Sequence, residues 1–282
     1  MRVALIPNLD KQHAWEYTVQ VCRLLREWRA VPVLPQYLQD RGTDAEYADG
    51  DALFANSDVL LTIGGDGTIL HAAKHAVRYG KPLLGLNCGR LGFLAELEAG
   101  EMDLLRDVTE GRFTTTPRML LDVTVHTGDR TLRRLALNDA VISRSGLPRL
   151  VEWTVQYQQQ CLCHYRSDGL IFATPTGSTG YSLSAGGPVI DPVTRCVLMT
   201  PVCPHSVFGR PVIFGAESEL CVQAALNSDE TVRAAIDGDE IIALHAGDRV
   251  EIRTAKEQLQ LIRLKNRSFY DVFTAKFSTA GE

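Results

Sequence analysis

The feature that most constrains this chain is an abrupt change from an apolar run to a cluster of glycines. Residues 59–63 read Val-Leu-Leu-Thr-Ile, and residues 64–67 read Gly-Gly-Asp-Gly. A helix is predicted over residues 68–79, ending at Gly80. A buried strand that ends in glycines and opens a helix brings backbone N–H groups close to a phosphate. We therefore expect an α/β unit that binds a diphosphate or triphosphate at the rim of its sheet.

The rest of the chain divides into two regions of different pattern. Up to about residue 117, strand-like and helix-like segments alternate, which indicates a parallel sheet covered by helices. The predicted strands are residues 2–7, 31–34, 59–63 and 82–86, and the predicted helices are 14–28, 68–79 and 101–110. Beyond residue 117, the sequence consists mostly of strand-like runs. They are residues 119–126, 132–143, 152–158, 169–173, 212–214, 219–225, 231–236, 249–254 and 258–264. We expect an N-terminal α/β domain with a parallel sheet (residues 1–117 and about 266–282), a β-rich, β-sandwich-like second domain (residues 118–265), and a ligand cleft between them.

Charge and composition exclude several classes of partner. The chain has 282 residues, with 29 Lys and Arg against 34 Asp and Glu, whereas nucleic-acid-binding proteins are usually basic. No stretch approaches the ~20 apolar residues that span a bilayer, and no signal peptide is recognisable, so we expect a cytoplasmic protein. The seven dispersed cysteines argue against a disulfide framework. Cys161 and Cys163 are interpreted as small buried side chains, and no metal-ligating set of side chains is predicted.

Asp66 stands out because a carboxylate in a phosphate loop repels its ligand unless it has a role of its own. It can bind the Mg²⁺ or other divalent cation that accompanies ATP, or accept a proton from an attacking hydroxyl group. The alternative is a helix cap. His71, one turn into the helix, either touches phosphate or is an exposed helix residue. The positions expected to bind phosphate through this loop are Gly64, Gly65, Gly67 and Thr68.

A second cluster of small polar residues lies between Asp168 and Pro188. A short apolar run, residues 169–173, leads into Thr-Pro-Thr-Gly-Ser-Thr at residues 174–179. This loop offers many hydroxyl and backbone donors and almost no charge, and Tyr181 adds a ring for stacking. The composition predicts a loop that wraps a polyhydroxylated, phosphate-bearing ligand.

With both clusters in view, nearly the whole chain resembles the NAD kinase family. Residues 64–68, 87–94, 137–142, 168–188 and 236–238 follow in the family's order. The first motif alone is weak, because diacylglycerol kinases and phosphofructokinases share a similar one, whereas the 174–179 segment is highly specific. The resemblance implies transfer of the γ-phosphoryl group of ATP to the 2′-hydroxyl of the adenosine ribose of NAD, giving NADP. It also implies a homodimer or homotetramer.

The resemblance also implies roles for particular residues. Asp66 resembles the proton acceptor, Asn138 and Asp139 the pair that contacts the adenosine part of NAD, Phe93 an aromatic residue near the nicotinamide, and Asp168 the acid that holds its carboxamide. The other positions implied to contact NAD are Arg149, Arg166, Thr179, Gly180, Tyr181, Ser182, Leu183, Ser184 and Asp239. The chain departs from the family at two of these, since the family usually has Ala at position 180 and often Gln at position 239.

Three other functions remain open at this point. A lipid or sphingoid kinase shares the first motif, but no basic amphipathic helix for a membrane surface is recognisable. A sugar-phosphate kinase needs several Arg or Lys side chains on its substrate, and the 168–188 segment has almost none. A non-catalytic NAD-sensing module needs the second cluster but has no use for Asp66. An assay for NADP formation separates these alternatives.

Overall fold

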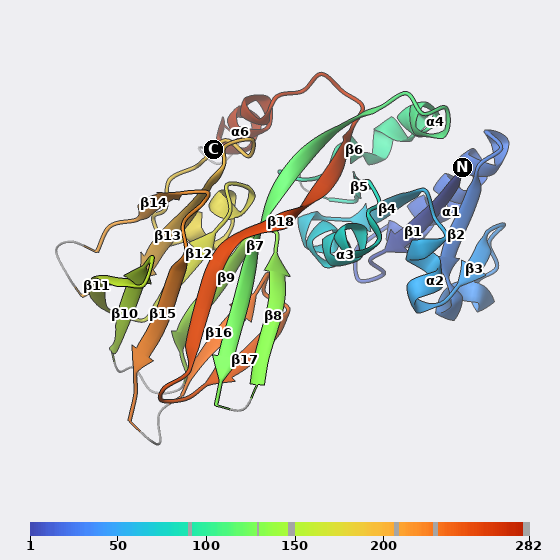
Figure 1. The fold of residues 1–282 in the computed structure, drawn as a ribbon. Helices are drawn as coiled ribbons and strands as arrows, with labels where there is room; N and C mark the ends of the chain where they lie inside the picture. The colour runs from blue at the N-terminus through green and yellow to red at the C-terminus, as the bar shows by residue number, and fades with distance from the viewer. Residues whose placement is uncertain (90–91, 129, 146–149, 206–208, 228–230, 279–282) are drawn as a thin grey trace. The chain divides into compact units, whose positions relative to one another are not determined.

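The protein is described by a computed structural model, which covers residues 1–89, 92–128, 130–145, 150–205, 209–227 and 231–278. Its contacts divide the chain into two compact units, shown with their elements in Figure 1. The first unit contains Met1–Pro117 and Leu259–Glu282, and the second contains Arg118–Gln258. The chain re-enters the first unit at Leu259 rather than at about residue 266, because one long strand continues through this point.

The first unit is built on a parallel sheet with the strand order β18-β5-β4-β1-β2-β3, in which β6 also pairs with β5. The strands are β1 (Arg2–Pro7), β2 (Val31–Pro35), β3 (Glu46–Ala48), β4 (Val59–Gly64), β5 (Leu83–Asn87), β6 (Leu97–Glu98) and the end of β18 (Arg249–Arg263). The order reverses between β1 and β4. Ligands of open parallel sheets bind at the carboxyl ends of the strands at such a switch point, which here is where β1 and β4 end.

Helices pack on both faces of this sheet. Leu84 and Leu86 of β5 share a core cluster with Leu25 of α1. Successive strand residues point to opposite faces, so Gly85 lies on the other face, against Ile69 of α3. The helices are α1 (Ala14–Glu27), α2 (Gly50–Ala55), α3 (Asp66–Tyr79), α4 (Leu105–Thr109) and α6 (Phe269–Ser278), with short 3-10 helices η1 (Gln36–Arg41) and η2 (Ala99–Leu104).

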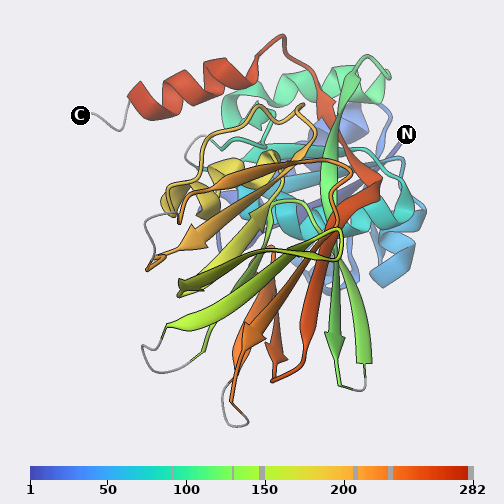
Figure 2. The same cartoon turned by 60° about the vertical axis from the view of Figure 1, so that its left-hand side comes forward.

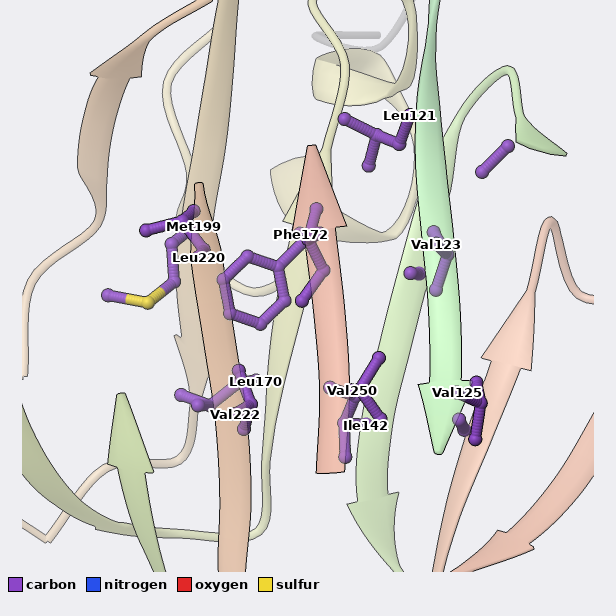
Figure 3. Packing of buried hydrophobic residues seen from close by; sticks show 14 of the residues in the cluster. Leu121, Val123, Val125, Ile142, Leu170, Phe172, Met199, Leu220, Val222 and Val250 are labelled. Atoms are coloured by element: carbon purple, nitrogen blue, oxygen red, sulfur yellow. The ribbon is translucent and has the colours of Figure 1, made fainter. Parts of the chain in front are cut away.

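The second unit consists of two antiparallel sheets that share one hydrophobic core. One sheet has the order β14-β13-β12-β9-β16-β17; the other has the order β11-β10-β15-β18, with β7 paired to β18 and β8. Trp153 and Phe172, one from each sheet, are fully buried in the core. Figure 3 shows part of this cluster, with Phe172 and Met199 from one sheet and Val123 and Val222 from the other. The β-rich second domain predicted from the sequence is confirmed, and its sheets are mostly antiparallel.

The bounds of the strands in the second unit follow from the same structure. They are β7 (Thr114–Thr127), β8 (Arg130–Ala136), β9 (Asp139–Arg144), β10 (Val151–Tyr157), β11 (Gln160–Ser167), β12 (Gly169–Ala173), β13 (Cys196–Val202), β14 (Val212–Gly215), β15 (Leu220–Ala225), β16 (Val232–Ile236) and β17 (Glu240–Leu244), with helices η3 (Thr176–Thr179) and α5 (Tyr181–Ser184).

Several element predictions were wrong. The run 132–143 is two strands, β8 and β9. The chain breaks between them because the backbone N–H groups of residues 137–139 bind the distant Asp237 carboxylate. The runs 249–254 and 258–264 are the single strand β18. Strands β11, β13 and β17 were not predicted. Cys161 is exposed and Cys163 only half-buried, so the interpretation of this pair as buried side chains was also wrong.

Candidate active site

The glycine-rich segment forms the junction between β4 and α3. β4 ends at Gly64, and α3 begins at Asp66, two residues earlier than predicted. Thr68 ties the turn together, because its Oγ1 accepts hydrogen bonds from the Gly65 backbone N–H (3.4 Å) and from Asn8 Nδ2 (3.3 Å), just after β1. The first N–H groups of a helix have no acceptor within it, and with the helix dipole they favour an anion here. The N-terminus of α3, at the switch point of the sheet, is therefore suited to an anion.

The carboxylate of Asp66 is held by the backbone of a second loop. The N–H of Phe93 donates to Oδ2 at 2.7 Å, and the N–H of Leu94 donates to Oδ1 at 3.2 Å. Gly92 is required beside them, since a Cβ at this position would overlap the carboxylate. The half-buried Asp66 is thus fixed from outside its own helix, which goes beyond the role of a helix cap.

The aromatic side chain of Phe93 lies against the C-terminal helix. Its ring is half-buried, with its centroid 5.9 Å from that of Phe269 and 4.5 Å from Lys276 Nζ. His71 is exposed, and its ring is edge-on to that of His75 at 6.1 Å. The first unit therefore brings residues 64–68 and Phe93 to one place and leaves His71 on the outer surface of α3.

In the second unit, the loop after β12 is tied to the start of β9. Thr174 Oγ1 donates to the Leu137 carbonyl at 2.6 Å, and the Thr174 N–H donates to the Asn138 carbonyl at 2.9 Å. Gly177 donates its N–H to Thr174 Oγ1 at 3.0 Å. It also lies so close to Asn138 that a Cβ would overlap the carbonyl group. Gly180 lies against the side chains of Asn138 and Asp139.

Asp237, in the turn between β16 and β17, fastens the same region from the other side. Its carboxylate accepts the N–H groups of Leu137 (2.8 Å), Asn138 (2.8 Å) and Asp139 (3.0 Å). Burial raises the pKa of Asp237, against the opposing effect of these three donors. The Asp139 residue is only 7% exposed, and burial together with the negative charge of Asp237 raises its pKa to about 7. Residues 137–139 are consequently rigid, and one buried carboxyl titrates near neutral pH.

Asp168 and the residues of α5 add further polar side chains to this region of the second unit. Asp168 Oδ1 accepts a hydrogen bond from Arg144 Nε at 2.8 Å, and both side chains are partly exposed. Ser182 is fully buried and shares a hydrogen bond with Thr200 at 2.8 Å, whereas Tyr181 is 47% exposed.

The structure thus gathers some of the predicted binding residues and separates others. In the second unit, residues 174–180 lie against Asn138 and Asp139. Arg166 is exposed on β11, and Asp239 is exposed beside Asp237. Arg149 lies outside the described residues. Thr179 and Leu183 are half-buried and Ser184 is exposed.

Two residues of this region were not assigned a role from the sequence. Asp237 lies about one hundred residues beyond the backbone that it binds, and Arg144 lies 24 residues before its partner Asp168. The Asp-Gly pair at residues 237 and 238 indicates a turn, but only the fold shows what its carboxylate binds.

Within the described part of the chain, no group of three or more His, Cys, Asp or Glu side chains is placed to hold a metal ion. None of the helices described is both long enough and apolar enough to cross a membrane.

Comparison with known proteins identifies what this arrangement resembles. Residues 3–113 match the ATP-NAD kinase N-terminal domain, and residues 137–264 match the ATP-NAD kinase C-terminal domain. The NAD kinase of Symbiobacterium thermophilum is 38% identical over 281 residues, covering 98% of this chain and 99% of that protein. The NAD kinase of Acetivibrio thermocellus is 34% identical over 285 residues, covering 100% and 99%.

Two solved structures share the fold at lower identity. Yeast NADH kinase complexed with NADH superimposes with a TM-score of 0.90 at 23% identity, covering 100% of this chain and 88% of that chain. An NAD kinase from Archaeoglobus fulgidus in complex with ATP gives a TM-score of 0.77 at 23% identity, covering 100% and 99%.

Proposed function

Because this chain belongs to the NAD kinase family, we propose that Asp66 accepts the proton of the NAD 2′-hydroxyl while that oxygen attacks the γ-phosphoryl group of ATP. The reaction gives NADP and ADP. The observation that carries this proposal is a half-buried acid at the first position of α3, inside the glycine-rich turn and fixed by two backbone donors.

The hydrogen bonds to Asp66 are compatible with its role as a base. An ionised carboxylate has about four lone-pair sites, and the two N–H donors occupy two of them. They orient the group and leave room for a hydroxyl donor. General base catalysis of this kind contributes typically about 10²–10⁴-fold to the rate.

The phosphates of ATP are bound by the backbone of residues 64–68. The N-terminus of α3 supplies N–H donors and a favourable dipole without a charged side chain. The loop that follows β5 begins at the end of the neighbouring strand. In this loop, Asn87 Nδ2 donates to the Gly89 carbonyl at 2.9 Å. Phosphoryl transfer has a loose transition state, so this positioning supplies much of the rate.

A divalent cation fits this donor set when it arrives with ATP. Mg²⁺ typically takes one or two carboxylates together with substrate phosphates and waters, and residues 64–68 contain one carboxylate, that of Asp66. The ion would neutralise charge that develops on the phosphates.

NAD is bound mainly by the second unit. Asn138 and Asp139 bind the adenosine half, and the rigid backbone formed by their ties to Thr174 and Asp237 keeps their side chains in place. Asp168 binds the nicotinamide carboxamide, with Arg144 fixing its orientation. The exposed ring of Tyr181 and the hydroxyl-rich segment around it line the dinucleotide site.

The active protein is proposed to be a cytoplasmic homodimer or homotetramer that binds neither nucleic acid nor membrane. Its formal charge of −5 supports the absence of nucleic-acid binding. Size-exclusion chromatography with light scattering tests the oligomeric state, and a monomer that forms NADP would contradict it.

The function is tested by incubating the purified protein with NAD, ATP and Mg²⁺ and measuring NADP with an NADP-specific dehydrogenase. We expect NADP in proportion to the ADP formed. A folded protein that binds NAD but forms no NADP would instead be a sensing module. Parallel incubations with NADH, other nucleoside triphosphates and polyphosphate define the acceptor and donor range.

A further inference from the structure

The C-terminal helix α6 has a one-sided attachment to its unit. Phe269, Val272, Phe273 and Lys276 are half-buried, and their spacing of i, i+3, i+4 and i+7 places them on one helical face. None of the helix residues is fully buried. Figure 2 shows α6 as the last helix of the chain, in red. The helix is therefore attached to its unit through one narrow face of side chains.

The contact made by this face is with Phe93. The centroid of the Phe269 ring is 5.9 Å from that of Phe93, and Lys276 Nζ lies 4.5 Å from the Phe93 centroid. Phe273 extends the cluster, since its ring lies 6.3 Å from that of Phe269. Two kinds of favourable contact, ring to ring and cation to ring, thus fall on one side chain.

Phe93 is also the residue whose N–H makes the shorter hydrogen bond to Asp66, at 2.7 Å. The segment 92–94 is anchored on one side by the buried Leu94 and has no space for a side chain at position 92. Phe93 is only half-buried, and two of its ring contacts come from α6. A continuous path of contacts therefore runs from α6 through Phe93 to the carboxylate of Asp66.

We propose that Phe269 and Lys276 of α6 are positioning residues for the phosphoryl transfer, acting through Phe93 on the carboxylate of Asp66. This inference rests on the proposed role of Asp66. Neither residue needs to touch NAD or ATP. When their contacts with the Phe93 ring are lost, the backbone of residue 93 gains freedom and the 2.7 Å donor no longer holds Asp66 in one orientation. A base that is out of place lowers turnover and leaves substrate affinity nearly unchanged.

The test compares four substitutions in the full-length protein. Phe269→Ala removes the ring that faces Phe93, and Phe269→Tyr keeps a ring in its place. Phe277→Ala removes a ring of the same size from the same helix, at a residue that is 45% exposed and whose neighbour is Phe273. Lys276→Met removes the charge while keeping a long side chain, and it serves if Phe269→Ala fails to fold.

We expect Phe269→Ala to lower kcat about three- to tenfold, the range that corresponds to the loss of an aromatic pair, with the KM values for NAD and ATP within about twofold of those of the unaltered protein. Phe269→Tyr restores kcat, and Phe277→Ala leaves it unchanged. Hydrogen exchange of the peptide containing residues 92–97 becomes faster in Phe269→Ala and in Lys276→Met, but not in Phe269→Tyr or Phe277→Ala.

Unchanged kcat and exchange in both Phe269→Ala and Lys276→Met would overturn the proposal, and so would an equal loss in Phe277→Ala. Failure of the underlying function has a different signature. In that case the unaltered protein forms no NADP, whereas the exchange measurement still reports whether α6 restrains residues 92–94.

Discussion

The two loops that contain the predicted functional residues, one in each unit, are built in opposite ways. In the first unit, the turn 64–68 is closed by the hydrogen bond from the Gly65 N–H to Thr68 Oγ1, and its one charged group, Asp66, is held by donors from residues 93 and 94. In the second unit, residues 174–177 are bonded to Leu137 and Asn138, and Asp237 binds the amides of residues 137–139. The first loop therefore has one carboxylate held by two donors from another segment, whereas the second loop is tied to neighbouring backbone at several points.

This difference matches the needs of the two tasks. Phosphoryl transfer depends on the orientation of one carboxylate, and small displacements of such a group are costly in rate. Binding a dinucleotide depends on many weak contacts made by a preorganised surface. The comparison predicts that changes around Asp66 act on kcat, whereas changes around Asn138 act on NAD affinity and on stability.

Gly92→Ala should have the largest effect, and it tests whether changes around Asp66 act on kcat. The new Cβ would overlap the Asp66 carboxylate, which must then rotate or move. We expect kcat to fall about 10²-fold, the scale on which a misplacement of about 1 Å acts, while the Kd for NAD changes little. The control is Gly89→Ala in the same loop, where nothing lies within 4 Å of the added atom. A normal kcat in Gly92→Ala would show that the position of Asp66 is not limiting.

Gly177→Ala tests the rigid loop in the same manner. Its Cβ would overlap the Asn138 carbonyl, and backbone atoms cannot move aside without disturbing β9. We expect a loss of about 1–3 kcal/mol in the free energy of unfolding, as for other overpacked sites, and a Kd for NAD raised about tenfold. Denaturant unfolding and calorimetry measure the two effects.

Gly180→Ala is the matched control for that variant. The nearest atom to its Cβ would be the Gly177 carbonyl oxygen at 3.2 Å, a contact that a small shift relieves. Unfolding and NAD binding should stay close to those of the unaltered chain. Equal damage by Gly177→Ala and Gly180→Ala would mean that the loop is not organised around Asn138.

Asp139 should give the stability of the second unit a dependence on pH. Burial and the nearby Asp237 raise its folded-state pKa from the ordinary 3.8 to about 7. A raised pKa contributes stability that is complete below about pH 4 and is lost as the pH rises through about 7, to a limit of about 4 kcal/mol. Asp139→Asn removes this loss, so its Tm relative to the unaltered chain should be higher at pH 8 than at pH 5. The exposed Asp103→Asn serves as control, and parallel pH profiles of Tm for Asp139→Asn and the unaltered chain would contradict the assignment.

The first loop was predicted better than the second because the residues that form it are close together in the sequence. A buried strand, glycines and a helix follow one another over about twenty residues, and each leaves a pattern in the sequence. The break between β8 and β9 leaves only the polar pair Asn138-Asp139 between two apolar runs. The amides at this break are bound by Asp237, about one hundred residues away. Tertiary contacts of this length override local propensity.

Other missed elements have equally specific causes. β11 lies at the edge of its sheet and its burial alternates, but the residue types hide this alternation, because the exposed face carries Leu162 and the buried face carries Ser167. β13 contains Pro201, which argues against a strand with neighbours on both sides. Its pairing with β14 ends at Met199, so Pro201 faces β12 alone and disrupts no ladder on the other side. The contact between Phe93 and α6 joins residues 176 apart and could not be predicted from local pattern.

The central claim is that Asp66 serves the chemistry and the second unit serves NAD binding. The most direct test is Asp66→Asn, which keeps the size of the side chain and removes its basicity, with kcat for NADP formation and the calorimetric Kd for NAD measured on the same preparation. We predict that kcat falls about 10²–10⁴-fold while the Kd changes less than about threefold. A near-normal kcat, or a loss of NAD binding as large as the loss of turnover, would contradict the account.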